Sequence, residues 1–181
     1  MAKLVADTYG QALFELALKS NALDAVADEV AFVRTIILEN KELLTILTHP
    51  KIGTQEKINV VENIFKGKVS DMIMGLMVTM IDKSRAGSIV KVFDYFLESA
   101  DEYRLIGHAD VISAMELTQD FKEKINAKLI ATTKYKSFKI KYTVDEDIIG
   151  GLIIRIGDRV VDSSVRTKLD KISKELLSVN V

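Results

Sequence analysis

The chain contains few side chains that are able to carry out chemistry. Histidine occurs only at His49 and His108, and there is no cysteine. His49 precedes Pro50, whereas His108 lies far along the chain at the start of a predicted strand. A zinc site needs several histidine, cysteine or carboxylate ligands at short spacings, and neither histidine has a second histidine or a cysteine at such a spacing. This pattern argues against a metal site and against histidine-dependent catalysis.

A second group of candidates lies near the C-terminus. The acidic run Asp145-Glu146-Asp147 lacks the alternating ligand spacing of a calcium loop, so a solvated turn is the better interpretation. The pair Gly150-Gly151 precedes a β-branched run, whereas a phosphate cradle needs the free N–H groups of a helix N-terminus. Ser163 and Ser164 have no base nearby in the sequence and suit a helix N-cap.

We therefore expect no catalytic residue, no metal ligand and no cofactor, and a protein that is not an enzyme. The alternative is a small enzyme that uses the acidic turn or the glycine pair. A search for bound metal or nucleotide in the purified protein would test that alternative.

Length and charge limit the classes of partner. The 181 residues, of which 48% are hydrophobic and 28% charged, suit one folded domain or two small ones. A net charge of −1 provides no long-range attraction for nucleic acid or anionic lipid. No apolar run approaches the roughly 18 residues of a membrane-spanning helix, and the N-terminus lacks the profile of a signal peptide. We expect no nucleic-acid partner, and association with a membrane only through other proteins.

Helical periodicity dominates residues 1–104. Apolar residues recur every three or four positions and predict a first helix over residues 3–19. Asn21 is expected to cap a second helix, and four more, joined by short connections, begin near Asn40, Thr54, Ser70 and Ser88. The core-facing residues predicted for the first helix are Val5, Tyr9, Ala12, Leu13, Leu16 and Ala17.

The pattern changes after Leu105. Residues 108–114 predict a strand, 118–132 a helix, and 138–144 a second strand, because apolar and polar residues alternate there. Residues 152–156 and Val160-Val161 predict two short strands joined by a turn at Gly157-Asp158, and a final amphipathic helix completes the chain. The sequence thus predicts a mainly α protein, with an N-terminal six-helix bundle in residues 1–104 and a smaller α+β C-terminal domain in residues 105–181.

The predicted fifth helix, Ser70 to Lys83, carries more apolar surface than a surface helix needs. An apolar arc of about 100° suffices to pack such a helix, and the excess indicates an interface with a partner helix. The first helix also has apolar residues opposite its core stripe. The expected groove residues are Leu4, Phe14, Leu18, Met72, Ile73, Met77, Met80 and Ile81. The alternative is that the fifth helix is fully buried, in which case its substitution lowers thermal stability instead of binding.

The C-terminal part combines a glycine pair, an apolar strand that ends in Gly-Asp, a hydrophobic pair, Asp-Ser and a basic amphipathic helix. The positions concerned are Gly150, Gly151, Leu152, Ile154, Arg155, Gly157, Asp158, Val160, Asp162, Ser163, Val165 and Leu169. Two further blocks accompany it, Tyr9-Gly10-Gln11-Ala12-Leu13 and the set Tyr103, Gly107, Ala109, Val111, Ser113, Ala114 and Leu117.

Together these blocks resemble the delta subunit family of F-type ATP synthases, which includes the mitochondrial oligomycin-sensitivity-conferring protein. The resemblance spans nearly the whole chain in the right order. The chain departs from the family pattern at Ser163, where the family often has Gly, and at Gly10, where it usually has Ala.

The resemblance implies a non-catalytic stator subunit. It implies that the helical domain binds the N-terminal helix of an alpha subunit in a groove between its first and fifth helices, and that the C-terminal domain binds the peripheral-stalk b subunits. It further implies a peripheral protein at the cytoplasmic face of a bacterial cell membrane. The alternative is a helix-binding adaptor or regulatory module unrelated to ATP synthase, which a pull-down of partner subunits would distinguish.

Overall fold

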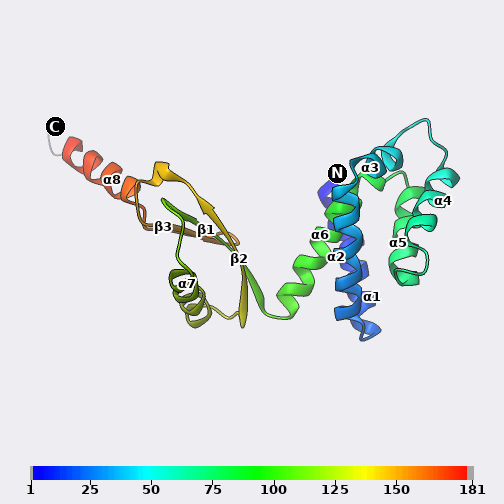
Figure 1. The fold of residues 1–181 in the computed structure, drawn as a ribbon, viewed down its shortest axis with the longest axis horizontal. Helices are drawn as coiled ribbons and strands as arrows, with labels where there is room; N and C mark the ends of the chain where they lie inside the picture. The colour runs from blue at the N-terminus through cyan, green and yellow to red at the C-terminus, as the bar shows by residue number, and fades with distance from the viewer. Residues whose placement is uncertain (1, 179–181) are drawn as a thin grey trace. The chain divides into compact units, whose positions relative to one another are not determined.

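The chain folds as a helical unit that ends at Asp101 and a mixed unit that begins at Glu102. The structure is a computed structural model that describes residues 2–178 (Figure 1). It is mainly helical, with a small four-stranded sheet in the C-terminal part. The helices up to the boundary are α1 (Ala2–Lys19), α2 (Leu23–Glu39), α3 (Lys41–Thr48), α4 (Thr54–Phe65), α5 (Asp71–Asp82), the 3-10 helix η1 (Ala86–Ser88) and α6 (Ile89–Tyr103).

One continuous hydrophobic core holds the helical unit together. It takes side chains from every helix of the unit, and its largest fully buried members include Phe65, Phe93 and Phe96. Each such side chain contributes roughly 1.5–3 kcal/mol by its removal from water. The helices therefore depend on tertiary packing more than on their own propensity.

The face that α1 turns toward this core differs from the sequence prediction. Its buried residues are Ala6, Gly10, Leu13 and Ala17. Ala12 is exposed and Leu16 is 50% exposed, so both were wrongly assigned to the core. The reason is a close approach between helices, because a Cβ at Gly10 would overlap the ring of Tyr95 on α6. Small residues allow that approach, which hydrophobicity alone did not predict.

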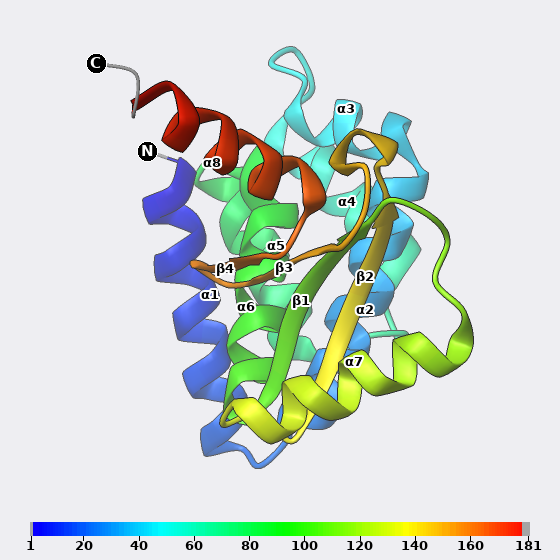
Figure 2. The ribbon, with the colours of Figure 1, turned by 90° about the vertical axis from the view of Figure 1, so that its left-hand side faces the viewer.

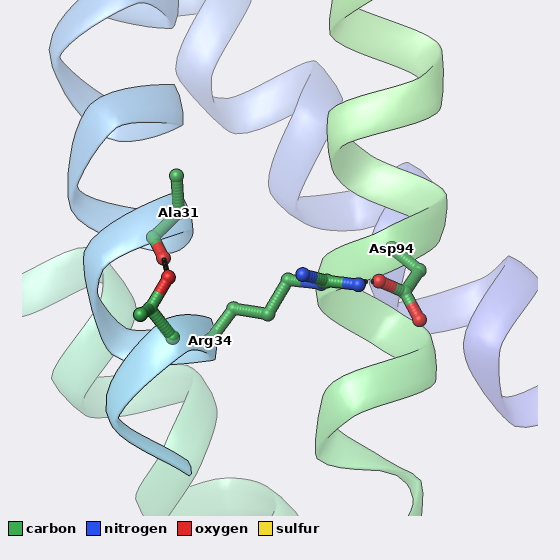
Figure 3. A network of polar contacts seen from close by, with 4 residues as sticks. Ala31, Arg34 and Asp94 are labelled. Carbon is green, nitrogen blue, oxygen red and sulfur yellow. Dashed lines mark hydrogen bonds and ion pairs between the residues drawn. The ribbon is translucent and has the colours of Figure 1, made fainter. Parts of the chain in front are cut away.

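An ion pair joins α2 to α6 near the surface of the helical unit. Arg34 Nε donates to Asp94 Oδ1 (Figure 3). The two side chains are 37% and 39% exposed, so water screens the pair. The contact orients the two helices and contributes little stability.

The mixed unit is built on a sheet with strand order β2-β1-β3-β4. Strands β1 and β2 run parallel and are joined through a helix, whereas β1–β3 and β3–β4 are antiparallel. The elements are β1 (Ile106–Ser113), α7 (Gln119–Thr132), β2 (Ser137–Val144), the 3-10 helix η2 (Glu146–Ile148), β3 (Leu152–Ile156), β4 (Arg159–Asp162) and α8 (Val165–Ser178).

One helix covers only part of one face of this sheet. Helix α7 packs against β2, and its Ile125 and Leu129 join Ala109 and Val111 of β1 in the core of the mixed unit. Figure 2 shows α7 in front of the β1–β2 side of the sheet. Helix α8 contacts η2 and leads away from the strands in Figure 1. Over residues 2–178, strands β3 and β4 are thus left without a helix of their own on the α7 face.

Candidate partner-binding surfaces

Half of the groove residues expected in the helical unit lie inside its core. Ile73, Met77, Met80 and Ile81 of α5 are at most 2% exposed and pack against residues of the other helices. Their expected exposure is therefore corrected: α5 turns its most apolar arc inward. The sequence pattern did not distinguish this arc from the rest, because α5 is apolar around most of its circumference and only tertiary packing decides which of its faces α1, α2 and α4 cover.

The other four expected residues reach the surface of the helical unit. Leu4 is 70% exposed, while Phe14, Leu18 and Met72 are half-buried. Helices α1 and α5, which carry them, are in contact with each other. We refer to these four residues as the α1–α5 surface.

The edges of α5 add to the apolar area that remains accessible. Met72 and Leu76 flank its buried arc on one side, and Met74 and Val78 flank it on the other; all four are half-buried. Between these edges the outward face of α5 is polar or small, with Gly75 at its centre. A partner helix that packs here would meet methionine and leucine at the edges of an otherwise flat polar strip.

A second apolar surface, which the sequence analysis missed, lies in the mixed unit. It is a groove of about 730 Å³ between α7 and the β3–β4 hairpin. Its apolar lining includes Phe121, Ile125 and Leu129 of α7 and Leu152, Ile154 and Ile156 of β3. We call it the α7–hairpin groove. It exists because α7 is too narrow to cover all four strands.

Strand register explains which hairpin residues line the groove. Ile154 lies opposite Val161, and Ile156 lies opposite Arg159, so these four side chains share the α7 face of the sheet. Val161 remains 49% exposed although it belongs to this apolar face. Val160, its neighbour, is 55% exposed and points to the opposite face.

The charged residues that line the α7–hairpin groove all have the same sign. Lys124 and Lys128 come from α7 and Arg159 from β4, and no carboxylate is among the lining residues that the structure describes. Lys124 Nζ contacts Asp120 Oδ2 at 2.6 Å and lies 5.5 Å from the ring centroid of Phe121. The groove is therefore mostly apolar, with three cations in its lining, of which Lys124 is paired with Asp120.

The glycine pair closes the loop that leads into the hairpin. Gly151 has a φ of +84°, and a Cβ there would overlap the carbonyl oxygen of Ser163. Val165 N–H donates to the Gly150 carbonyl at 2.9 Å, which ties the start of α8 to the same loop. The close approach of two backbone segments at a positive φ explains glycine at 151, whereas a Cβ at Gly150 would lie 3.2 Å from Cγ2 of the Val165 side chain.

The rest of this block also has structural roles. Gly157 has a φ of +55° and, with the exposed Asp158, forms the two-residue turn between β3 and β4. The Ser164 hydroxyl accepts the Thr167 N–H at 3.2 Å, so Ser164 is the N-cap of α8, while Ser163 lies before it. One of the two serine assignments from the sequence is thus confirmed.

Asp162 stabilises the same helix start. Its carboxylate accepts the Ser164 N–H and the Thr167 hydroxyl, both at 2.8 Å. These hydrogen bonds, first of all that of the Ser164 backbone, lower the pKa of Asp162 below its ordinary value. Elsewhere in the unit, burial raises the pKa of Tyr142, whose hydroxyl donates to the Lys122 carbonyl at 3.4 Å.

The other chemical candidates from the sequence have local structural surroundings. His49 Nδ1 accepts the Lys51 N–H at 3.2 Å in a turn, and Asp145 Oδ1 accepts the Asp147 N–H at 3.0 Å at the start of η2. His108 lies on β1, far along the chain from His49. Over residues 2–178 the structure places no three histidine or acidic residues where they could hold a metal ion together. Nor does any helix in this range have the length and apolarity to cross a membrane.

Comparison with known proteins decides the family. Residues 5–176 match the model of the family described as ATP synthase delta (OSCP) subunit. The chain belongs to this family. The delta (OSCP) family is a non-catalytic, structural component of ATP synthase, so the expectations of the family and of a protein without its own enzyme activity are confirmed.

Individual relatives agree with this assignment over their full length. The chain is 51% identical to "ATP synthase subunit delta" of Lachnoclostridium phytofermentans, over 100% of both chains. It is 34% identical to the protein of the same name from Alkalihalophilus pseudofirmus, over 96% of both chains. Among solved structures, it resembles a chain of the Toxoplasma gondii mitochondrial ATP synthase hexamer with a TM-score of 0.74, at 19% identity and over 95% of this chain and 97% of that one.

The sequence did not predict the α7–hairpin groove or its exposed lining residues Phe121 and Val161. A signal was present, because Phe121 lies on the expected helix and Val160-Val161 was predicted as a short strand. Only the register of β3 and β4, which the sequence did not specify, shows that Val161 faces α7 and Val160 does not.

Proposed function

We propose that this chain is the non-catalytic stator subunit that links the catalytic head of an F-type ATP synthase to its peripheral stalk. The observation that carries the proposal is the match of the full chain to ATP synthase delta subunits. Two separate units, each with its own apolar surface, suit a connector that binds two partners. A connector of this kind prevents the head from turning with the rotor during ATP synthesis.

The helical unit is proposed to act as a six-helix bundle that binds the N-terminal helix of an alpha subunit. The α1–α5 surface supports this role, because Leu4, Phe14, Leu18 and Met72 leave apolar area accessible on two helices that are in contact. The buried α5 residues fix the position of α5, and so of this surface, by packing in the core; they are Ile73, Met77, Met80 and Ile81. Affinity then comes from apolar burial, since exposed ion pairs contribute little.

The mixed unit is proposed to bind the b subunits of the peripheral stalk. It supports this role with an open apolar groove and an α8 whose Leu169, Ile172 and Leu176 are each more than half exposed. The protein would then be held at the cytoplasmic face of a bacterial membrane through the assembled complex. That placement also rests on the bacterial origin of its full-length relatives.

Reconstitution tests the overall function. Catalytic heads stripped of their delta subunit are combined with membranes that retain the rest of the complex, with and without this protein. We expect proton-driven ATP synthesis only when the protein is present, while ATP hydrolysis by the free heads is unchanged. Equal ATP synthesis in its absence would contradict the stator role.

A matched pair of variants tests the head contact. Phe14→Ala removes a half-buried ring of the α1–α5 surface, and Phe32→Ala removes a ring on α2 that is 45% exposed and lies outside this surface. Calorimetric titration with a peptide of the alpha-subunit N-terminus should show about a tenfold or greater loss of affinity for Phe14→Ala alone. Equal affinity of the two variants would exclude Phe14 from the contact.

A further inference from the structure

The methionines of the chain differ sharply in their access to water. Met77 and Met80 of α5 are 1% and 0% exposed in the core of the helical unit. Met72 and Met74 are half-buried, on opposite edges of the buried arc of the same helix. Met115, between β1 and α7, is 72% exposed. A reagent that attacks methionine in the folded chain therefore reaches Met72, Met74 and Met115 before the two core residues.

Among these accessible methionines, Met72 is the member of the α1–α5 surface. We infer that Met72 is an oxidation site, at which a hydroperoxide controls whether the free chain can bind the alpha-subunit helix. This inference rests on the proposed function, since it assigns the head contact to the α1–α5 surface. A bound partner helix covers that surface, so the reaction belongs to the free chain before assembly.

The oxidation of Met72 is a two-electron transfer of one oxygen atom. Its thioether sulfur attacks one oxygen of hydrogen peroxide, so that an S–O bond forms and the O–O bond breaks. The proton of the attacked oxygen passes to the departing hydroxide, which leaves as water. The sulfur is oxidised to the sulfoxide and the peroxide is reduced, and no metal or further reductant takes part.

The sulfoxide opposes binding of a helix more than it opposes folding. Its oxygen is a hydrogen-bond acceptor that loses its water when an apolar partner covers it. The other members of the α1–α5 surface, Leu4, Phe14 and Leu18, have hydrocarbon side chains that offer this oxygen no donor. In the free chain Met72 is only half-buried, so part of its side chain is already in water. Oxidation should therefore lower affinity while the helical unit stays folded.

Met74 and Met115 provide matched controls, because they carry the same thioether outside the α1–α5 surface. Three double variants of the full chain each keep one accessible methionine and replace the other two by leucine, which preserves apolar volume and resists peroxide. They are Met74→Leu with Met115→Leu, Met72→Leu with Met115→Leu, and Met72→Leu with Met74→Leu. Met1 is common to all three, so its oxidation does not distinguish them.

Each variant is compared with its own peroxide-treated form. Affinity for the N-terminal peptide of the alpha subunit from the same genome is measured by calorimetry. We expect oxidation to lower it at least about tenfold in the variant that keeps Met72 and less than about twofold in the other two. Methionine sulfoxide reductases A and B should restore the affinity. Peptide bound beforehand should slow the oxidation of Met72 and leave that of Met115 unchanged.

Two further measurements show where the oxygen has been added and whether the fold survives. All four methionines of α5 lie in one tryptic peptide, between Lys68 and Lys83, so mass spectrometry with fragmentation of that peptide locates the added oxygen. Thermal unfolding of each oxidised variant is followed by circular dichroism. We expect the oxygen on the accessible methionine, none on Met77 or Met80, and little change in melting temperature.

The possible outcomes separate the inference from the function on which it rests. If the untreated chain does not bind the peptide, the head contact itself is wrong and the inference falls with it. If the untreated chain binds and oxidation of Met72 leaves the affinity unchanged, or oxidation of Met74 lowers it equally, the head contact stands and the inference is overturned. A loss of affinity that appears only with oxygen on Met77 or Met80 and a lowered melting temperature would show unfolding, which also overturns it.

Discussion

The burial of α5 leads to a sharp prediction from two methionines on one helix. Met77 is 1% exposed in the core of the helical unit, whereas Met72 is half-buried at the edge of the α1–α5 surface. Replacing each by alanine removes the same atoms from two different surroundings. Met77→Ala should lower stability, and Met72→Ala should mainly lower affinity for the alpha-subunit peptide.

The size of the first effect follows from the packing. Truncation of a buried methionine to alanine costs about 2–5 kcal/mol, because transfer free energy is lost and a cavity remains. In a unit of this size, each kcal/mol corresponds to about 4–8 °C in melting temperature, so Met77→Ala should lower it by at least about 8 °C. Met72 leaves part of its side chain in water, so the same change should lower the melting temperature less than half as much.

Two measurements on the full chain separate the effects. Thermal unfolding is followed by far-ultraviolet circular dichroism, and peptide affinity is measured by calorimetry well below the melting temperature. Met77→Ala should retain the affinity within about twofold, and Met72→Ala should lose about tenfold. Equal melting temperatures for the two variants would refute the assignment of Met77 to the core, and a loss of affinity confined to Met77→Ala would refute the α1–α5 surface as drawn.

Three further predictions concern the loops and the helix contacts. Gly151→Ala should unfold the hairpin or lower the melting temperature of the mixed unit, since a Cβ meets the carbonyl oxygen of Ser163 at a positive φ; an unchanged melting curve would contradict this. The pKa of Asp162 is lower in the folded chain than its ordinary 3.8, so its contribution is present above that pH and is lost as the pH falls through the folded value. Asp162→Asn should therefore flatten the acid loss of stability in titrations of the folded fraction, and an unaltered acid limb would count against it. A double-mutant cycle on Arg34 and Asp94 should give a coupling of about 0.2–1 kcal/mol, because both side chains are more than one-third exposed; a coupling of several kcal/mol would mean that the pair is shielded from water.

Regular alternation and turn chemistry were the most informative parts of the sequence. The alternation from Phe138 to Val144 predicted β2, which the structure places at Ser137–Val144. It was readable because one face of this edge strand carries lysine and threonine and the other packs on α7. The pair Gly157-Asp158 predicted the turn between β3 and β4 for an equally local reason.

Other signals were ambiguous because one residue type serves two purposes. Asn21 was predicted to cap the second helix, yet the N-cap of α2 is Ala22, and Asn21 has a φ of +50° in the turn that follows α1. Asparagine is favoured both as an N-cap and in the left-handed conformation that ends a helix. The sequence correctly predicted a break between α1 and α2. It assigned Asn21 to the start of α2, whereas Asn21 belongs to the turn that follows α1.

Interfaces between distant segments were beyond local reasoning for a different reason. The four core residues of α5 and the open edges of the same helix have similar hydrophobicity, and only the packing of α1, α2 and α4 separates them. The α7–hairpin groove likewise depends on which strands α7 leaves uncovered. In both cases the sequence indicated how much apolar surface is present, while its division between core and interface required tertiary structure.

The two units differ in how many of their apolar residues are buried in a core and how many are exposed to water. Among the described residues, the main core cluster of the helical unit holds twenty-two buried hydrophobic residues, whereas that of the mixed unit holds four. The mixed unit instead leaves Phe121, Val161 and the apolar face of α8 in contact with water. A unit with so small a core gains much of its stability from whatever covers those residues, because binding to the folded state alone shifts the folding equilibrium. In the proposed stator role, we therefore expect this unit to become rigid only when its partner is bound.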